Sequence, residues 1–420
     1  MSNISALSTA AIQVLTTSQI RSFSTATVAA LRTDQIAAMT SDQIAAISTA
    51  GIGALSSAQL MAIETQDIAA LTTSQVQAIA TARISALTTD QLRALETADV
   101  AVLRSNQLAA LSTTQVTSLT TDQIVALTTG QVQAFGTSAV AALTTDQVVA
   151  LETRDLAALR TNQVAALSAD QVVALSTDQI VGLGTHQVRA LTSGSVAALT
   201  TDQVAALETR DVAALTSTQA RALTTDQVVA LTTEGIAALS TAAVAALSTD
   251  QVVAIETTDV VALSTGQIQA LGTAAVAALT TDQVVALETR DVAALRTNQV
   301  AALSTDQIVE LTTDQVVALG THQVRALSTD AIAALTTDQV AAMETRDLAA
   351  LTSTQARALT TDQVVALTTE GIAALSTAAV AALSTDQVVA IETTDVVALT
   401  TGQVRALSTD AIAALTTDQV

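Results

Sequence analysis

An eight-residue repeat runs through the chain from Leu7 to the last residue. The first octads read LSTAAIQV, LTTSQIRS and FSTATVAA, and the register continues without insertion or deletion through 51 complete octads. A six-residue fragment, LTTDQV, follows them, so we expect the sequence to be cut from a longer protein. Units this short bury their apolar side chains only by stacking on one another, and the repeat therefore predicts a solenoid.

A longer period is superimposed on the octads. LGTHQVRA begins at 183 and again at 319, and LTSTQARA begins at 215 and again at 351, in both cases 136 residues later. We therefore divide the chain into a lead-in (1–6), diverged octads that act as an N-terminal capping region (7–126) and near-identical octads (127–420). Diverged terminal repeats are expected where a solenoid must be capped.

The eight positions of the octad, numbered so that Leu is position 1, differ in polarity. Position 1 is apolar, position 3 is Thr or Ser apart from Ala169, position 6 is Val, Ile or Leu in nearly every octad, and position 8 is usually Ala. The pattern predicts that positions 1, 3, 6 and 8 face inward, with Glu310 at position 8 as an exception. Positions 2, 4 and 5 are predicted to face water, and position 7 is expected at the rim.

Each octad also carries a helix-start signal. Ser or Thr at position 2 followed by Gln at position 5 is a capping box, and the apolar residues at positions 1 and 6 occupy the sites of a hydrophobic staple. Position 2 is sometimes Glu, Arg or Gly, so the cap can instead be position 3, or the position 3 hydroxyl can bond to the backbone of a neighbouring repeat.

The predicted fold is an all-α solenoid, a superhelix of very short helices with one helix in each octad. One continuous helix is rejected, because eight residues advance about 800° and the Leu stripe would wander around the axis. A β-solenoid is the alternative, since Thr and Val favour strands. Against it, the inward positions do not alternate strictly and the Gly or Asn typical of strand turns is scarce.

Composition excludes several classes of protein. The chain has 16 basic and 38 acidic residues, giving a net charge of -22, and it contains no Cys, Pro, Trp or Tyr. Half of the residues are hydrophobic, which is too many for a disordered acidic chain. The apolar runs are far shorter than the roughly 20 residues of a membrane-spanning helix. Disulfides and thiol chemistry are excluded, and no transmembrane span is expected.

Eight octads have Glu at position 2, and in all eight position 5 is Asp, which occurs at position 5 in no other octad. Carboxylate oxygens suit Ca²⁺, so these pairs are candidate divalent-cation sites, whereas the simpler interpretation is a variant helix start with Asp favoured by the helix dipole. The candidates are Glu64, Asp67, Glu96, Asp99, Glu152, Asp155, Glu208, Asp211, Glu256, Asp259, Glu288, Asp291, Glu344, Asp347, Glu392 and Asp395.

Other charged residues are read as surface groups. Three of these octads are followed by Arg at position 2, which predicts a surface charge ladder of the pairs Glu96/Arg104, Glu152/Arg160 and Glu288/Arg296. His186 and His322, copies of one another at position 4, are expected to be solvated. No base is placed beside a nucleophile and no Gly-rich phosphate loop is present, so we expect no enzyme activity and no cofactor.

The segment LTTDQVVAL, at 143–151 and 223–231, resembles the opening of the DNA-binding repeat of transcription-activator-like effectors, LTPEQVVAI. The resemblance covers one short helix of that family's repeat and implies the same helix start. The base-reading loop and its basic residues are absent, and the negative charge disfavours phosphate. Nucleic acid is therefore not an expected partner.

From Leu7 onward the chain resembles the LTTDQ-type octad arrays of very large bacterial proteins described as adhesion-like, haem-utilisation-like or toxin-like. This resemblance implies a secreted or cell-surface spacer. The first residues, Met1 to Ser5, have no signal-peptide pattern, so a leaderless route is expected. The first hypothesis for function is a structural or adhesive scaffold, a rigid acidic rod. The alternative is a module that binds cations, ice or a protein, with self-association through the repeat ends.

Overall fold

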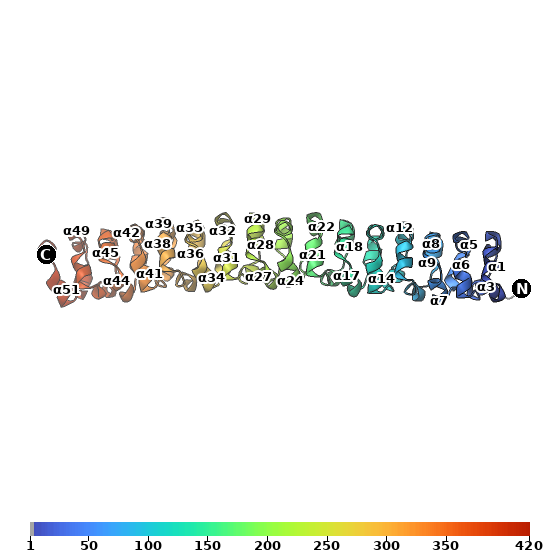
Figure 1. The fold of residues 1–420 in the computed structure, drawn as a ribbon. Helices are drawn as coiled ribbons and strands as arrows, with labels where there is room; N and C mark the ends of the chain where they lie inside the picture. Colours follow the sequence, from blue (N-terminus) through green and yellow to red (C-terminus); the bar gives the residue numbers. More distant parts are fainter. Residues whose placement is uncertain (1–3) are drawn as a thin grey trace. The chain divides into compact units, whose positions relative to one another are not determined.

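The computed structural model describes residues 4–420, which form 51 α-helices of four to six residues and one short 3₁₀ helix, Ile4–Ala6, and contain no strand. The chain divides into two compact units, unit 1 ending at Asp211 and unit 2 beginning at Val212. In each unit the short helices follow one another along a coiled path (Figure 1). The all-α prediction is confirmed, and the β-solenoid alternative is wrong for residues 4–420.

The helices of unit 1 are α1 (Thr9–Gln13), α2 (Thr17–Arg21), α3 (Thr25–Ala29), α4 (Thr33–Ala37), α5 (Ser41–Ala46), α6 (Thr49–Ala54), α7 (Ser57–Met61), α8 (Thr65–Ala69), α9 (Thr73–Ala78), α10 (Thr81–Ile84), α11 (Thr89–Ala94), α12 (Thr97–Ala101), α13 (Ser105–Ala109), α14 (Thr113–Ser118), α15 (Thr121–Val125), α16 (Thr129–Val132), α17 (Thr137–Ala142), α18 (Thr145–Ala150), α19 (Thr153–Ala157), α20 (Thr161–Val164), α21 (Ala169–Ala174), α22 (Thr177–Val181), α23 (Thr185–Val188), α24 (Ser193–Ala198) and α25 (Thr201–Ala205).

Next in the chain is α26 (Thr209–Val212), and the helices of unit 2 are α27 (Ser217–Ala222), α28 (Thr225–Ala230), α29 (Thr233–Ala238), α30 (Thr241–Val244), α31 (Thr249–Val253), α32 (Thr257–Ala262), α33 (Thr265–Ala270), α34 (Thr273–Ala278), α35 (Thr281–Ala286), α36 (Thr289–Ala294), α37 (Thr297–Val300), α38 (Thr305–Glu310), α39 (Thr313–Ala318), α40 (Thr321–Val324), α41 (Thr329–Ala334), α42 (Thr337–Ala342), α43 (Thr345–Leu348), α44 (Ser353–Ala358), α45 (Thr361–Ala366), α46 (Thr369–Ala374), α47 (Thr377–Ala382), α48 (Thr385–Val389), α49 (Thr393–Val396), α50 (Thr401–Ala406) and α51 (Thr409–Ala414).

Each helix begins at position 3, with position 2 as its N-cap. In α18, for example, Thr144 is extended (φ -72°, ψ 160°), and its hydroxyl accepts a hydrogen bond from the backbone N–H of Gln147. The Gln147 side chain in turn accepts from the N–H of Thr144, which completes the capping box. The capping-box prediction is confirmed, and the alternative cap at position 3 is wrong.

Each helix ends at or next to position 8, because the following Leu at position 1 is extended. Leu151, which follows α18, has φ -60° and ψ 130°. No residue in 4–420 has a positive φ. The chain therefore leaves each helix through an extended apolar residue rather than through a left-handed Gly.

The buried positions differ partly from the prediction. Positions 1 and 6 are buried as expected, but position 5 is also buried, whereas position 3 is exposed or half-buried and position 8 is mostly half-buried. The physical reason is helix geometry: positions 5 and 6 lie four and three residues before the next position 1, so they share its face. Position 3 is the first helical residue and points away from that face, and Glu310 at position 8 is exposed.

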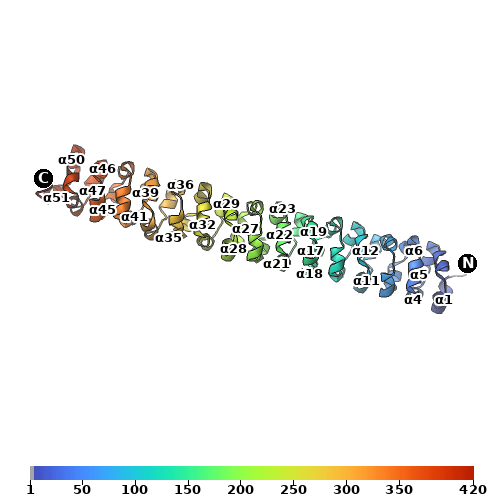
Figure 2. The same cartoon turned by 90° about the horizontal axis from the view of Figure 1, so that it is seen from above.

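The helices stack three apart along the chain. In the described residues of each unit, the helix pairs in extensive contact join α5 to α8, α8 to α11, α11 to α14, and so on. Three octads, or 24 residues, therefore make one coil of the solenoid. The view from above shows the same succession of coils within each unit (Figure 2).

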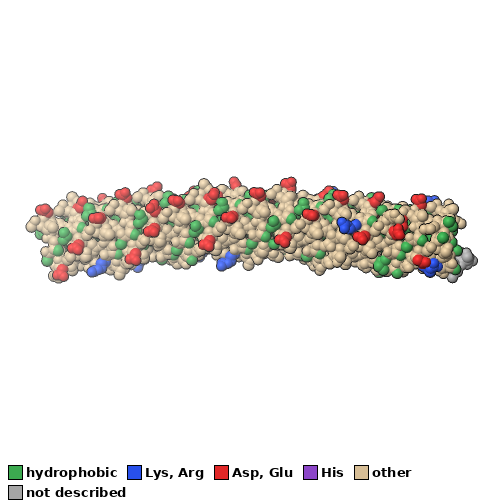
Figure 3. Space-filling model, in the orientation of Figure 1, with side chains coloured by type: hydrophobic (Ala, Val, Ile, Leu, Met, Phe, Trp, Pro, Cys, Tyr) green, Lys and Arg blue, Asp and Glu red, His purple; other side chains and the backbone are tan. Residues whose placement is uncertain are grey.

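The core of each unit is aliphatic and continuous. Its members are the position 1 and position 6 side chains, such as Leu143, Val148 and Leu151, which are at most 5% exposed. Each buried Leu or Val contributes about 1.5–3 kcal/mol before conformational entropy is subtracted. Acidic side chains are spread over the visible surface of both units, with few basic ones among them (Figure 3). No helix within 4–420 is long and apolar enough to cross a membrane.

Candidate functional site: the buried polar residue at position 5

Position 5 places a polar side chain in the core of nearly every coil. Where it is Gln, the side chain bonds in two directions, as Gln107 shows. Its Oε1 accepts from the backbone N–H of Arg104, 2.8 Å away, and its Nε2 donates to the carbonyl of Ile79, 28 residues earlier, at 2.8 Å. That carbonyl lies at the C-terminal end of α9, four octads back. The Gln side chain therefore caps the start of one helix and the end of another.

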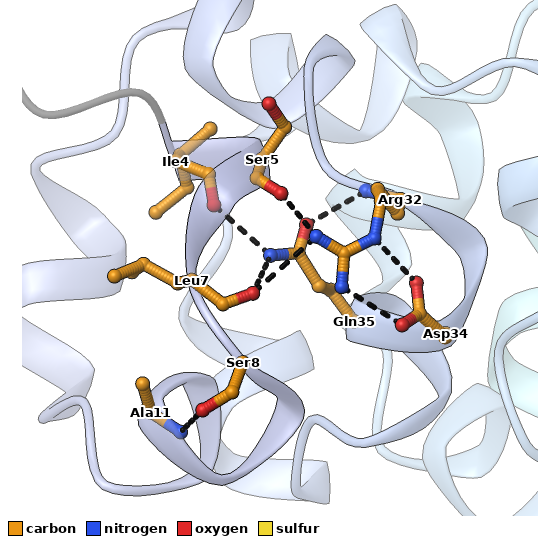
Figure 4. Close-up of polar contacts among 8 residues, drawn as sticks. All are labelled: Ile4, Ser5, Leu7, Ser8, Ala11, Arg32, Asp34 and Gln35. Carbon is orange, nitrogen blue, oxygen red and sulfur yellow. Dashed lines mark hydrogen bonds and ion pairs between the residues drawn. The ribbon is translucent and has the colours of Figure 1, made fainter.

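The same arrangement begins at the start of unit 1. Gln35 donates to the carbonyls of Ile4 and Leu7, at 2.9 Å and 2.8 Å, while its Oε1 accepts from the N–H of Arg32 (Figure 4). Arg32 also pairs with Asp34 at 2.8 Å. We call this repeated set of inter-coil bonds from position 5 the Gln ladder. The sequence pattern missed it because Gln was taken to be a solvated residue.

In the eight Glu–Asp octads, Asp takes the place of Gln on the inward face. The Asp side chains at position 5, which were predicted to face water, are buried, with exposures from 0% to 4%. The correction applies to Asp67, Asp99, Asp155, Asp211, Asp259, Asp291, Asp347 and Asp395. Asp is the third residue of its helix and lies on the face shared with the next Leu, so it is carried into the core like the Gln that it replaces.

The partner Glu residues remain at the surface. Glu64 is the N-cap of α8, is exposed, and makes no side-chain capping bond. The same capping arrangement, without a side-chain bond, is found at Glu96, Glu152, Glu256, Glu288, Glu344 and Glu392. Each Glu lies at the start of the same helix as its Asp, as the spacing predicted.

A hydroxyl from the preceding coil reaches several of the buried carboxylates. Ser41 donates to Asp67 at 2.6 Å, across 26 residues. Thr donors at the same offset serve Asp155, Asp211, Asp259 and Asp395, at 2.6–2.8 Å. The position 3 hydroxyl thus bonds to a repeat in the next coil, and at Ser217 and Ser353 it bonds to backbone carbonyls. The expectation that this hydroxyl contacts a neighbouring repeat is confirmed for these residues.

Four Glu–Asp octads contain their own Arg at position 4. Arg154 pairs with Glu152 at 2.6 Å and lies 3.8 Å from the Asp155 carboxylate. The same triad recurs around Arg210, Arg290 and Arg346, with Glu distances of 2.5–2.7 Å and Asp distances of 3.5–3.7 Å. The Arg lies two residues from the Glu and one from the Asp, so it spans the exposed and the buried carboxylate.

The predicted surface charge ladder is wrong. Glu152 and Glu288 pair with Arg154 and Arg290 inside their own octads. No ion pair in residues 4–420 joins Glu96 to Arg104, Glu152 to Arg160 or Glu288 to Arg296. The nearer Arg at position 4 was overlooked, although the motif ETRD was visible in the sequence.

Burial sets the electrostatics of these carboxyl groups. Burial raises the pKa of Asp67, Asp99, Asp291 and Asp347 above the ordinary value for Asp. Nearby Glu residues raise it further, whereas Arg290 and Arg346 oppose the rise at Asp291 and Asp347. Within residues 4–420, Oδ2 of Asp67 and Oδ2 of Asp211 are buried without a hydrogen-bond partner, as are Oδ1 of Asp347 and both oxygens of Asp291. A charge in such surroundings is costly.

The described residues bring together no group of three or more His, Asp, Glu or Cys side chains that could hold a metal ion. Each Glu–Asp pair therefore supplies two carboxylates from one helix start, and in four octads an Arg side chain already pairs with them. Divalent-cation binding at these sixteen residues stays a prediction. His186 and His322 are exposed, as expected.

The comparisons with known proteins agree with the repeat structure. A search of the curated proteins finds no match for the chain. A family model described as the ALTTAQ repeat matches the chain thirteen times, at residues 18–49, 60–97, 92–129, 125–153, 148–185, 180–209, 204–241, 252–289, 284–321, 313–344, 340–377, 366–390 and 388–420. Because these matches cover far more than half of the chain, the protein belongs to the ALTTAQ repeat family.

Proposed function

We propose that this chain is a non-enzymatic structural scaffold, a spacer within a larger bacterial surface or secreted protein. The observation that carries the proposal is the constancy of the inter-coil contacts. The Gln ladder links residues 28 apart again and again, as in Gln91 to Ile63, Gln107 to Ile79 and Gln123 to Leu95, each at 2.7–2.8 Å. A fold whose contacts are all with the neighbouring coil gains length with each added octad and needs no other partner.

The chemistry of the surface supports the same proposal. The position 5 groups are committed to the core, and the exposed positions carry mainly Thr, Ser and acidic side chains. Repetition of that surface over many coils favours solubility and spacing. The resemblance to the LTTDQ-type arrays of very large bacterial proteins supports a secreted or cell-surface setting, and adhesion would then be a property of the larger protein.

Distance measurements in unit 1 test the spacer. The chain has no Cys, so spin labels can be attached to pairs of introduced Cys without background. Asp42→Cys would be combined with Gln66→Cys, Asp90→Cys or Thr114→Cys, which are exposed position 4 residues in octads one, two and three coils further on. We expect three narrow distance distributions whose means increase by equal steps. Broad distributions, or distances that do not increase with the coil number, would contradict the spacer.

The same labelled chains test the binding alternative. A binding module is stabilised by its ligand, because binding to the folded state adds to its stability. We expect addition of CaCl₂, followed by chelation, to leave both the label distances and the thermal midpoint unchanged beyond the effect of matched NaCl. A calcium-specific rise in the midpoint, lost in a Glu64→Gln/Asp67→Gln variant, would favour the cation-binding hypothesis over the passive spacer.

A further inference from the structure

The three octads around α12 show what the exchange of Gln for Asp removes. In octads before and after it, Gln91 donates to the carbonyl of Ile63 at 2.7 Å and Gln107 donates to the carbonyl of Ile79 at 2.8 Å. Between them stands Asp99, 3% exposed. The equivalent carbonyl, 28 residues earlier, is that of Leu71. No side chain in residues 4–420 donates a hydrogen bond to it, because an ionised carboxylate has no proton to give.

The Asp side chain keeps only the local half of the Gln arrangement. The backbone N–H of Glu96, the N-cap of α12, donates to the Asp99 carboxylate and so lowers its pKa, but burial has the larger effect and raises it. Each Glu–Asp octad therefore combines two unfavourable features, a missing inter-coil bond and a buried carboxylate. The first is worth about 0.5–1.5 kcal/mol in a typical case, and the second adds to it.

The charged groups around Asp99 do not neutralise it. On α12 and at its cap the charged side chain is Glu96, which raises the pKa of Asp99 further. The helices packed against α12 are α9, which has no charged residue, and α15, which carries the exposed Asp122. Around Asp67 the corresponding groups are Glu64 on the cap, Asp42 on α5, and Asp90 and Arg93 on α11. Glu64 raises the pKa of Asp67.

We propose that the Glu–Asp octads are acid-responsive seams, at which the solenoid opens locally at neutral pH and closes when the buried Asp takes up a proton from solvent. The seams interrupt the Gln ladder at α8, α12, α19, α26, α32, α36, α43 and α49, and so divide the array into shorter fully bonded stretches. Local opening in a repeat protein starts where the interface between neighbours is weakest.

The direction of the pH effect follows from the raised pKa. A carboxyl group with a higher pKa in the folded than in the unfolded chain binds its proton more tightly when folded. Its contribution to stability is complete below the unfolded pKa and is lost as the pH rises through the folded pKa. For Asp67 and Asp99, the seam is therefore tighter in mild acid than at neutral pH, opposite to the usual behaviour of a paired surface carboxylate.

The chain contains its own controls for this proposal. Position 5 is Gln107 in α13, with the ladder intact, and Ala139 in α17, where the ladder is interrupted by a buried but uncharged residue. If charge matters, the octad of Asp99 responds to pH and the octad of Ala139 does not. If only the missing hydrogen bond matters, both octads open easily and neither responds.

Hydrogen exchange of the full chain, read by mass spectrometry at pH 7 and pH 5 and corrected for the intrinsic rates of an unstructured peptide, tests the proposal. We expect the α12 amides to be less protected than those of α13 at pH 7, with the difference narrowing at pH 5. Asp99→Gln, which installs the residue found in the neighbouring octads, should raise α12 protection at pH 7 roughly five- to thirty-fold and abolish its response to pH.

A second variant separates charge from bonding. Asp99→Asn is neutral but one methylene shorter than Gln, so it should remove the pH response without restoring the full protection of Asp99→Gln. Equal protection of α12 and α13 in the parent chain at pH 7 would overturn the proposal. So would a pH response of α12 that persists in Asp99→Asn, because surface carboxylates would then be its source.

Discussion

At Gly182 the backbone of α22 lies directly against a side chain of α19, one coil earlier. A Cβ added to Gly182 would collide with the Cγ2 methyl group of Thr153. The backbone itself is ordinary, with φ -68° and ψ -16°, so the need for Gly arises from the close approach of two coils and not from backbone strain. At Gly130, in α16, an added Cβ would meet nothing within 4 Å.

These two glycines give a matched pair of predictions. Gly182→Ala should destabilise its coil by about 1–3 kcal/mol through overpacking, whereas Gly130→Ala should stabilise its helix by about 0.5–1 kcal/mol because Gly is unfavourable inside a helix. Hydrogen exchange of α19, α22 and α16 in the full chain measures both changes. The double variant Gly182→Ala/Thr153→Ser, which lacks the methyl group, should recover the lost protection; failure to recover it would exclude this contact as the cause.

At the scale of the helix, the N-cap is the feature that varies most between octads. Ser168 caps α21 through a side-chain bond to the N–H of Gln171 at 3.2 Å, whereas Arg160, the N-cap of α20, has no such bond. Both octads retain the reciprocal bond from Gln, since the N–H of Arg160 donates to Gln163 at 2.8 Å. The orphan N–H at the start of α20 is therefore one that a hydroxyl would satisfy.

Arg160→Ser should therefore stabilise α20 by about 0.5–2 kcal/mol, the usual value of such a cap. Arg160→Ala serves as the control, because it removes the same guanidinium without adding an acceptor, and it should give no gain. The measurement is the protection of the α20 amides in the full chain. Equal protection in the Ser and Ala variants would show that the hydroxyl does not cap this helix.

The helix starts were predictable because their signals are local. Position 2, position 5 and the apolar pair at positions 1 and 6 all lie within one octad, and the structure confirms the register that they predict. The burial of Gln147 and Asp155 was not predictable in the same way. Their partners lie 26 to 31 residues away, at Val116 and Leu119 for Gln147 and at Thr129 for Asp155. A polar residue is correctly assigned to the core only when the coil length is known.

The coil length also explains a pattern in the whole sequence. Because helices three octads apart stack, residues 24 apart at the same position lie on neighbouring helices of one face. Asp122, Asp146 and Asp170, all at position 4 and exposed, lie in this way on α15, α18 and α21, and these helices are in contact. Like charges aligned along one face repel one another, and the net charge of -22 adds to the effect.

Salt should therefore stabilise the protein. Raising NaCl from 0.1 M to 1 M shortens the screening length from about 10 Å to about 3 Å, and the protection of α18 against hydrogen exchange should increase because its repulsion with α15 and α21 is screened. Asp146→Asn should increase the protection of α18 in low salt and reduce its response to salt, since it removes the middle charge of the row.

Asp90→Asn is the matched control. Asp90 is also an exposed Asp at position 4, but the equivalent residues one coil away are the uncharged Gln66 and Thr114. We expect this variant to leave the salt response of α11 nearly unchanged. Equal changes in the two variants would contradict the aligned-charge explanation, because the salt effect would then come from the total charge of the molecule and not from the 24-residue spacing of its Asp residues.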